Sequence, residues 1–217
     1  MCSGYPTQLM LGEALKAVGI SPLTADGLLS ATFVFALSLG DTAVLVSLML
    51  WLLVRNGEQP RDVFFGSRHA GEETVIGVLS LPLVVALVLA LSLLIRTFAP
   101  FLHNVPENPL EGLLGTQTGL WAFLVVVIVA GGLREELQRA FLLHRFRRDL
   151  GHAGAGLVIT SVAFGLGHTL QGWDAAILTG ALGVTWGLMY LRRGNAIAPI
   201  VSHSLFNTGE LLRAFLR

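Results

Sequence analysis

The chain has 217 residues, of which 53% are hydrophobic and only 13% are charged, and its mean hydropathy is +0.71. A soluble domain carries about twice that charged fraction, so the composition indicates an integral membrane protein. The 14 basic residues equal the 14 acidic ones, which leaves no net charge for binding nucleic acid. The single cysteine, Cys2, excludes an internal disulfide and a cysteine-rich metal site within one chain.

The N-terminal segment, residues 1–28, lacks the basic start and the apolar core of a signal peptide. We therefore expect the protein to insert through its own helices. The remainder, residues 29–217, shows no repeat or low-complexity tract that would divide it. The sequence predicts a single membrane-embedded domain there.

Six apolar runs approach the ~20 residues that a helix needs to cross the hydrocarbon core. They predict an all-α, polytopic bundle of transmembrane helices with its active site in a cavity between helices. The sixth run is shorter and more polar than the others. The six runs cover residues 29–54, 74–98, from 118 into the glutamates at 135 and 136, 153–170, 174–191 and 196–215.

Arginines are concentrated in alternate loops. The loops 99–117 and 170–174 contain no Lys or Arg, whereas the other three carry several. By the positive-inside rule the arginine-bearing loops are cytoplasmic and both termini lie outside, although Arg213 and Arg217 oppose that orientation. The arginine-rich, lysine-poor composition suggests a bacterium, so we expect a multi-pass protein of the bacterial inner (cell) membrane. The loop arginines are Arg55, Arg61, Arg68, Arg145, Arg147, Arg148, Arg192 and Arg193.

Polar residues inside the apolar runs are candidates for function, because an ionised group at bilayer depth costs at least ~2.5 kcal/mol. Asp41, in "SLGDTAV", is interpreted as the mark of an interrupted or interfacial helix. The other candidates are Glu135, Glu136, Arg139, His168, His203 and Asn207.

Glu135 and Glu136 lie four and three residues before Arg139. On a helix either carboxylate can pair with that guanidinium, which leaves the other one free. A simpler alternative is that "LREELQRAFLLHRFRRD" is only the amphipathic cytoplasmic end of the third run.

Two further spacings place polar groups on the fourth and sixth runs. Phe164 and His168 are four apart, so the phenyl ring can brace the imidazole, and His203 and Asn207 are also four apart. Gly183 and Gly187 on the fifth run form a GxxxG pattern that favours close helix packing and can hold the fourth and sixth runs near one another.

Together these groups form the inventory of a hydrolytic site. A Glu and a His can deprotonate a water, directly or through a divalent metal such as Zn²⁺, and a second His with an Asn can stabilise an oxyanion. Two His and one Glu also form a known zinc ligand set, which makes Glu135, His168 and His203 the candidate metal ligands.

Glu135-Glu136, the FxxxH of residues 164–168 and the HxxxN of residues 203–207 resemble, in this order, the motifs of the CPBP family, the CAAX-protease and bacteriocin-processing (Abi) group of intramembrane glutamate or metallo-endopeptidases. The resemblance covers about residues 118–210. It implies that Glu135 and His168 activate water while His203 and Asn207 bind the tetrahedral intermediate, in a cavity open toward the membrane.

Arg139 departs from the family pattern EExxxR, because it stands one residue early and so lies about 100° away around the helix. If this displacement matters, Gln138 is a candidate to orient Glu135 instead.

The expected partners are the lipid bilayer and a membrane-associated protein or peptide substrate. Resemblance suggests a prenylated CAAX protein, a bacteriocin or signal peptide, or a C-terminal sorting anchor. Two alternatives stay open: a proton-coupled small transporter, because buried Glu and His also relay protons, and a catalytically idle immunity or scaffold protein.

Overall fold

The computed structural model describes residues 5–106, 113 and 117–216. Apart from one isolated antiparallel bridge between Leu23 and Leu29, the described regular structure is helical, which confirms the predicted all-α class. Short 3-10 turns lie at Pro100–Leu102 and Thr169–Gln171. The helices are α1 Tyr5–Ala17, α2 Ala31–Arg55, α3 Pro60–Phe64, α4 Ala70–Phe98, α5 Gln117–Val126, η3 Val127–Arg134, α6 Glu135–Asp149, α7 Ala153–Leu166, α8 Trp173–Arg193 and α9 Ile197–Phe215.

Three of the described helices, α2, α4 and α8, are long and apolar enough to cross a membrane, and α7 is a shorter apolar helix. Large apolar side chains point outward from α4, where Leu79 and Leu83 are 72% and 69% exposed. Such a surface is stable in lipid, where apolar side chains need no cover. The composition and the exposed surface agree with the predicted helical membrane bundle.

The first span differs from its prediction. Helix α2 runs without interruption through Gly40 and Asp41, so the expected break at this point is wrong. Asp41 is fully buried, and its carboxylate is accommodated by partners from other helices rather than by an irregular backbone.

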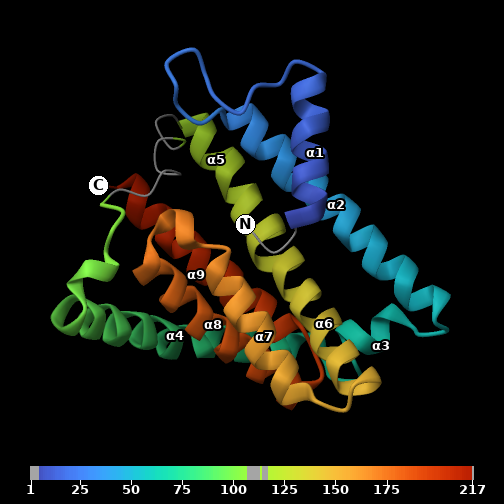
Figure 1. The fold of residues 1–217 in the computed structure, drawn as a ribbon. Coiled ribbons are helices and arrows are strands. Elements are labelled where there is room, and N and C mark those ends of the chain that lie inside the picture. Colours follow the sequence, from blue (N-terminus) through green and yellow to red (C-terminus); the bar gives the residue numbers. More distant parts are fainter. Residues whose placement is uncertain (1–4, 107–112, 114–116, 217) are drawn as a thin grey trace.

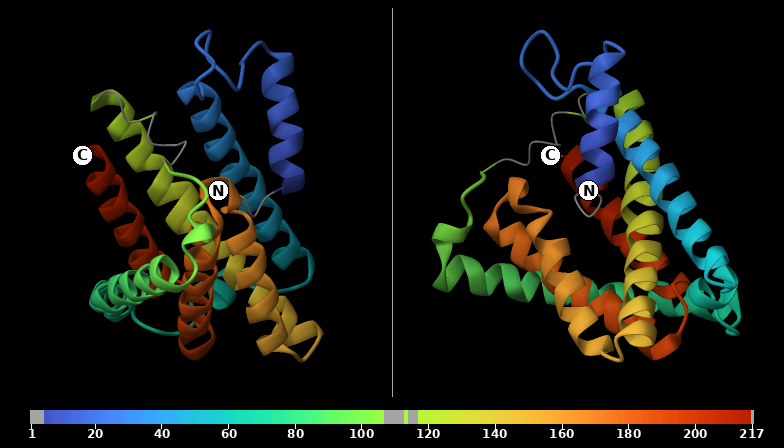
Figure 2. Two further views of the ribbon diagram at one scale, coloured as in Figure 1. Left: turned by 60° about the vertical axis from the view of Figure 1, so that its left-hand side comes forward. Right: turned by 45° about the vertical axis from the view of Figure 1, so that its right-hand side comes forward.

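The third predicted span is one continuous helix in which the hydrogen-bonding pattern changes: the α-helix α5 is followed by the π-helical segment η3 and then by the α-helix α6. Figures 1 and 2 show this path running diagonally beside α9. A Cβ on Gly131 would lie 2.7 Å from Asn207 Nδ2, and one on Gly132 would lie 1.9 Å from Ser204 Oγ. Only glycine permits this approach, so Gly131 and Gly132 allow α9 to pack directly against the π-helical segment η3.

Helices α7 and α8 pack closely through small residues. A Cβ on Gly165 would lie 2.5 Å from the Ala176 carbonyl oxygen, and one on Gly187 would lie 2.5 Å from Leu157. Gly183 faces Ser161 and Phe164 of α7. The GxxxG pattern therefore serves close packing, as predicted, but it holds α8 against α7 rather than α7 near α9.

The three arginine-bearing loops gather at one end of the bundle, toward the bottom of Figure 1. Arg68 Nε donates to the Arg193 carbonyl oxygen at 2.8 Å, and Tyr190 Oη donates to the Val63 carbonyl oxygen at 2.9 Å. The loops without arginine also meet: the Trp173 amide donates to Asn104 Oδ1 at 2.9 Å. This grouping is what the positive-inside interpretation requires of loops on a common side, and the orientation itself stays a prediction.

Candidate active site

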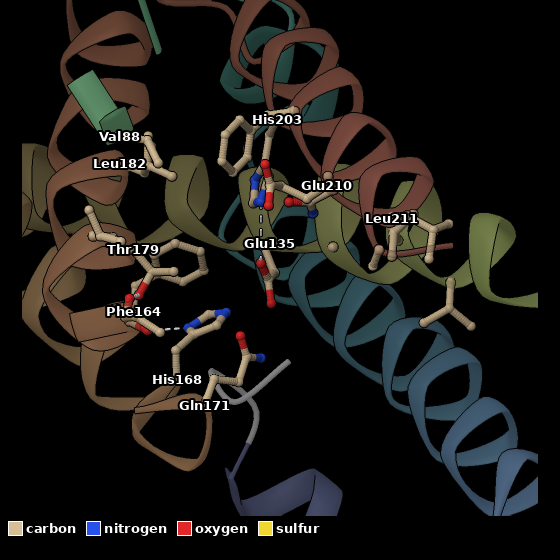
Figure 3. Close-up of a pocket in the computed structure, with 18 of the residues that line it drawn as sticks. Val88, Glu135, Phe164, His168, Gln171, Thr179, Leu182, His203, Glu210 and Leu211 are labelled. Atoms are coloured by element: carbon tan, nitrogen blue, oxygen red, sulfur yellow. Dashed lines mark hydrogen bonds and ion pairs between the residues drawn. The ribbon is translucent and has the colours of Figure 1, made fainter. Parts of the chain in front are cut away.

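A cavity of about 280 Å³ opens between the π-helical segment, α7, α8 and α9. Four of the predicted site residues line it: Glu135, His168, His203 and Asn207. Figure 3 shows Glu135 and His168 facing one another across it, with His203 above. Much of the remaining wall is apolar and includes Phe123, Val126, Val127, Phe164, Leu178, Leu182, Trp186 and Phe206.

Glu135 is the first residue of α6, immediately after the π-helical segment. Its side chain is 3% exposed, and its Oε1 accepts a hydrogen bond from Arg134 Nη2 at 3.1 Å. Its Oε2 lies 3.9 Å from His203 Nε2. The expectation that one glutamate stays free of a guanidinium is therefore wrong: the partner of Glu135 is the arginine that directly precedes it.

Arg134 is a site residue that the sequence interpretation missed. Its side chain is 1% exposed, and its Nη1 donates to Gln138 Oε1 at 3.3 Å and lies 3.5 Å from Asp41 Oδ2. Gln138, the proposed alternative, contacts Arg134, and its role in orienting Glu135 stays a prediction. The sequence feature that points to a buried arginine is Asp41, because an acidic residue within an apolar run needs a cationic partner.

Glu136 and Arg139 do not line the cavity but lie buried behind it. Arg139 Nη1 forms an ion pair with Glu136 Oε1, and the same oxygen lies 2.8 Å from His203 Nδ1. The Arg139 guanidinium also lies 4.6 Å from the centre of the Phe164 ring. The early position of the arginine therefore directs it to Glu136, and this pair contacts the cavity through His203.

His203 is held on two sides. Its Nδ1 faces a Glu136 carboxylate oxygen, so this nitrogen carries a proton and donates it. Its ring stacks on Trp186, with centroids 3.8 Å apart and an interplanar angle of 16°. Trp186 Nε1 in turn donates to Ser202 Oγ at 3.2 Å. These contacts direct Nε2 of His203 toward Glu135 and the cavity.

His168 lies just beyond the end of α7, in the turn that precedes α8, rather than within a span as predicted. The predicted brace is nevertheless present, because its ring lies 4.8 Å from the Phe164 ring, edge to face. His168 Nδ1 lies 2.8 Å from the Phe164 carbonyl oxygen. A carbonyl only accepts, so Nδ1 is the donor, and Nε2 of the neutral ring is left as an acceptor for a group in the cavity.

Asn207 lies one turn after His203 on α9 and completes the cavity wall. Its amide nitrogen rests against Gly131 of the π-helical segment. The amide can donate hydrogen bonds into the cavity next to His203, which is the arrangement that an oxyanion site requires.

The predicted metal ligands, Glu135, His168 and His203, surround one cavity and have the nitrogen and oxygen donors that suit Zn²⁺. Within the part of the chain that the structure describes, however, no three His, Cys, Asp or Glu side chains come together closely enough to hold a metal ion. A metal centre at Glu135, His168 and His203 therefore stays a prediction.

Comparison with known families gives a match over residues 116–209, to the family described as type II CAAX prenyl endopeptidase Rce1-like. This match agrees with the family predicted from the motifs, and the matched range nearly coincides with the predicted 118–210. The four predicted site residues that line the cavity, Glu135, His168, His203 and Asn207, fall within it. Comparisons with curated proteins and with solved structures give no match.

Proposed function

We propose that this chain, whose residues 116–209 belong to the Rce1-like family of type II CAAX prenyl endopeptidases, hydrolyses a peptide bond of a membrane-associated protein or peptide within its helical bundle. The family supports an intramembrane CAAX-type protease. One observation carries the residue-level proposal: a carboxylate, two imidazoles and an amide from separate helical segments line a single cavity.

The first step is the activation of water. Nε2 of His168 is an acceptor, because Nδ1 of the same ring faces the Phe164 carbonyl oxygen. A water that donates one hydrogen bond to His168 and one to Glu135 is oriented between two acceptors. Glu135 then takes the proton as the water oxygen attacks the substrate carbonyl carbon, and it later returns that proton to the departing amine nitrogen.

The second requirement is stabilisation of the oxyanion. Asn207 Nδ2 donates one hydrogen bond to it, and His203 donates a second from Nε2. Since His203 Nδ1 already donates to Glu136, this role requires protons on both ring nitrogens. Carboxylate oxygens lie beside both ring nitrogens, that of Glu136 at 2.8 Å from Nδ1 and that of Glu135 at 3.9 Å from Nε2.

The family match and the lining of the cavity support a proposal for the substrate class. A largely apolar wall suits a peptide segment that bears lipid or hydrophobic side chains. We propose a prenylated CAAX protein first, with a bacteriocin or signal peptide and a C-terminal sorting anchor as the other candidates.

The proposal is tested with purified protein in proteoliposomes and mass spectrometry of substrate termini. Glu135→Ala, His168→Ala and His203→Ala are each expected to abolish cleavage while the protein still inserts and accumulates. Glu210→Ala is the matched control, because Glu210 lines the same cavity but pairs with Arg213 at 2.7 Å. Full cleavage by Glu135→Ala would contradict the mechanism, and proton flux that is lost in Glu135→Gln would favour a transporter.

A metal requirement is tested separately. If a divalent ion such as Zn²⁺ takes part, Glu135, His168 and His203 are its proposed ligands, and activity is expected to disappear on treatment with a chelator and to return with Zn²⁺. Activity that survives exhaustive chelation would assign water activation to Glu135 and His168 alone.

A further inference from the structure

The guanidinium of Arg134 donates hydrogen bonds from each of its three nitrogens to acceptors within the protein. It donates from Nη2 to Glu135 Oε1 at 3.1 Å, from Nη1 to Gln138 Oε1 at 3.3 Å and from Nε to the Ala130 carbonyl oxygen at 3.2 Å. Its side chain is 1% exposed. A planar guanidinium bound in this way has a single orientation, and it imposes that orientation on the carboxylate beside it.

The second carboxylate on Arg134 comes from outside the matched family segment. Asp41 Oδ2 of α2 lies 3.5 Å from Arg134 Nη1, and the Asp41 side chain is 1% exposed. Asp41 in turn accepts hydrogen bonds from two side chains of α1, Thr7 Oγ1 and Gln8 Nε2, the latter at 3.1 Å. A continuous series of contacts thus joins the N-terminal helix to Glu135.

We infer that Asp41 and Arg134 are positioning residues that fix the rotation of the Glu135 carboxylate, and that α1 belongs to this catalytic assembly. The inference rests on the proposed function. With Oε1 held by Arg134, the other oxygen, Oε2, is the one turned toward His203. A base whose carboxylate rotates freely would present a proton-accepting oxygen to the water only part of the time.

The separation of these residues along the chain makes the inference specific. Asp41, Thr7 and Gln8 lie outside the matched residues 116–209. Thr7 and Gln8 contact Asp41, and Asp41 contacts Arg134, which immediately precedes the proposed base. A purely structural ion pair elsewhere in the bundle has no such connection: Glu73, fully buried, binds Arg193 at 2.6 Å, and neither residue lines the cavity.

The first test compares two isosteric changes, Asp41→Asn and Glu73→Gln. Both weaken a buried ion pair, so both are expected to lower the thermal unfolding midpoint. Only Asp41→Asn is expected to lower kcat, by about 10- to 100-fold as for a displaced catalytic group, with KM within twofold of the wild type. Glu73→Gln is expected to keep kcat within twofold.

The second test asks whether Asp41 and Arg134 act together. Arg134→Gln is expected to lower kcat more than Arg134→Lys, because Lys retains the charge. The double variant Asp41→Asn/Arg134→Lys is expected to lose no more kcat than the worse single variant, since residues in one network are not additive.

The contribution of α1 is measured with Thr7→Val and Gln8→Leu, whose side chains are only partly buried. These variants keep the inference testable if Asp41→Asn does not fold. Each is expected to lower kcat at unchanged KM. Glu13→Gln on the same helix, which breaks the exposed 2.8 Å pair with Lys16, is the control and is expected to match the wild type.

All variants are assayed beside Glu135→Ala, which separates the two hypotheses. If Glu135→Ala is inactive but Asp41→Asn and the α1 variants keep wild-type kcat, the inference is overturned and the proposed function stands. If Asp41→Asn loses kcat only in proportion to its folded fraction, the inference is also overturned. Full activity in Glu135→Ala overturns both.

Discussion

The indole of Trp186 stacks on the imidazole of His203, with ring centroids 3.8 Å apart and 16° between their planes. Trp186 is 1% exposed, so the stack lies inside the bundle, where it forms part of the cavity wall. It restrains rotation of the His203 ring, which its Nδ1 contact with Glu136 alone would permit. The proposed oxyanion donor is therefore oriented by an aromatic surface as well as by a carboxylate.

We expect Trp186→Ala to lower kcat because it frees the His203 ring, and to reduce the free energy of unfolding by about 3–5 kcal/mol. Trp186→Phe keeps an aromatic face against His203 and loses only the hydrogen bond to Ser202, so it is expected to retain more activity. Both are measured as kcat at a temperature below the unfolding midpoint of each variant. Equal kcat in the two variants would show that the stack has no role in orientation.

The Glu136–Arg139 pair gives a prediction that separates stability from activity. Glu136→Gln leaves a buried guanidinium without its ion-pair partner, which is expected to cost about 3–5 kcal/mol of unfolding free energy. Adding Arg139→Gln removes the uncompensated charge and is expected to restore much of that stability. Activity is expected to stay low in both, because His203 Nδ1 has lost its carboxylate acceptor. Recovery of kcat in the double variant would contradict the positioning role of Glu136.

Gly131 allows the amide of Asn207 to rest against the π-helical segment. A Cβ there would lie 2.7 Å from Asn207 Nδ2, so Gly131→Ala is expected to displace the amide and to lower kcat by up to the ~100-fold attributed to one oxyanion donor. Gly154→Ala in α7 is the control, since a Cβ there meets nothing within 4 Å. It is expected to leave kcat unchanged and, as a helical Gly→Ala change, to stabilise slightly.

The arginine-bearing end of the bundle carries a pH-dependent contact. Burial raises the pKa of Glu58, but its contacts with His144, Arg145 and Arg148 outweigh this and lower it from 4.5 to about 2. The unfolded chain therefore binds more protons than the folded protein between pH 2 and 4.5, so stability rises with pH across this window. The contribution of the Glu58 carboxylate to stability is complete above pH 4.5 and is lost as the pH falls toward 2.

The measurement is the thermal unfolding midpoint in detergent micelles from pH 6 down to pH 2, for the wild type and Glu58→Gln. The wild type is expected to be the more stable at pH 6, and the difference is expected to shrink as Glu58 becomes protonated. A difference that stays constant over this range would show that the Glu58 carboxylate contributes nothing through its charge.

Much of the site was predictable from the sequence. Polar groups inside apolar runs are costly, and their spacing indicates which helices carry them, so the sequence predicts that Glu135, His168, His203 and Asn207 form one site, and all four line one cavity. The predicted spans also agree well with α2, α4 and α8. Their catalytic roles stay predictions that the experiments above address.

The partners of the two glutamates were not predictable in the same way. Helical spacing allows Arg139 to pair with either Glu135 or Glu136, and the spacing alone does not determine which of the two carboxylates forms the pair. Helical spacing does not predict the contact between Arg134 and Glu135, because adjacent residues on a regular helix point in different directions. In the structure the π-helical segment ends between them, and Arg134 Nη2 reaches Glu135 Oε1.

The sequence by itself determined that the protein lies in lipid, that its fold is all-α and which types of polar residue form the site, because hydropathy and residue type are local properties of the chain. The tertiary structure decided which charged side chains form pairs. Asp41 contacts Arg134 across helices far apart in the chain, and Gly131 and Gly132 admit α9 to the cavity wall. Contacts between distant segments depend on how the helices pack, so only the folded bundle shows that the N-terminal helix is connected to the proposed base through Asp41 and Arg134.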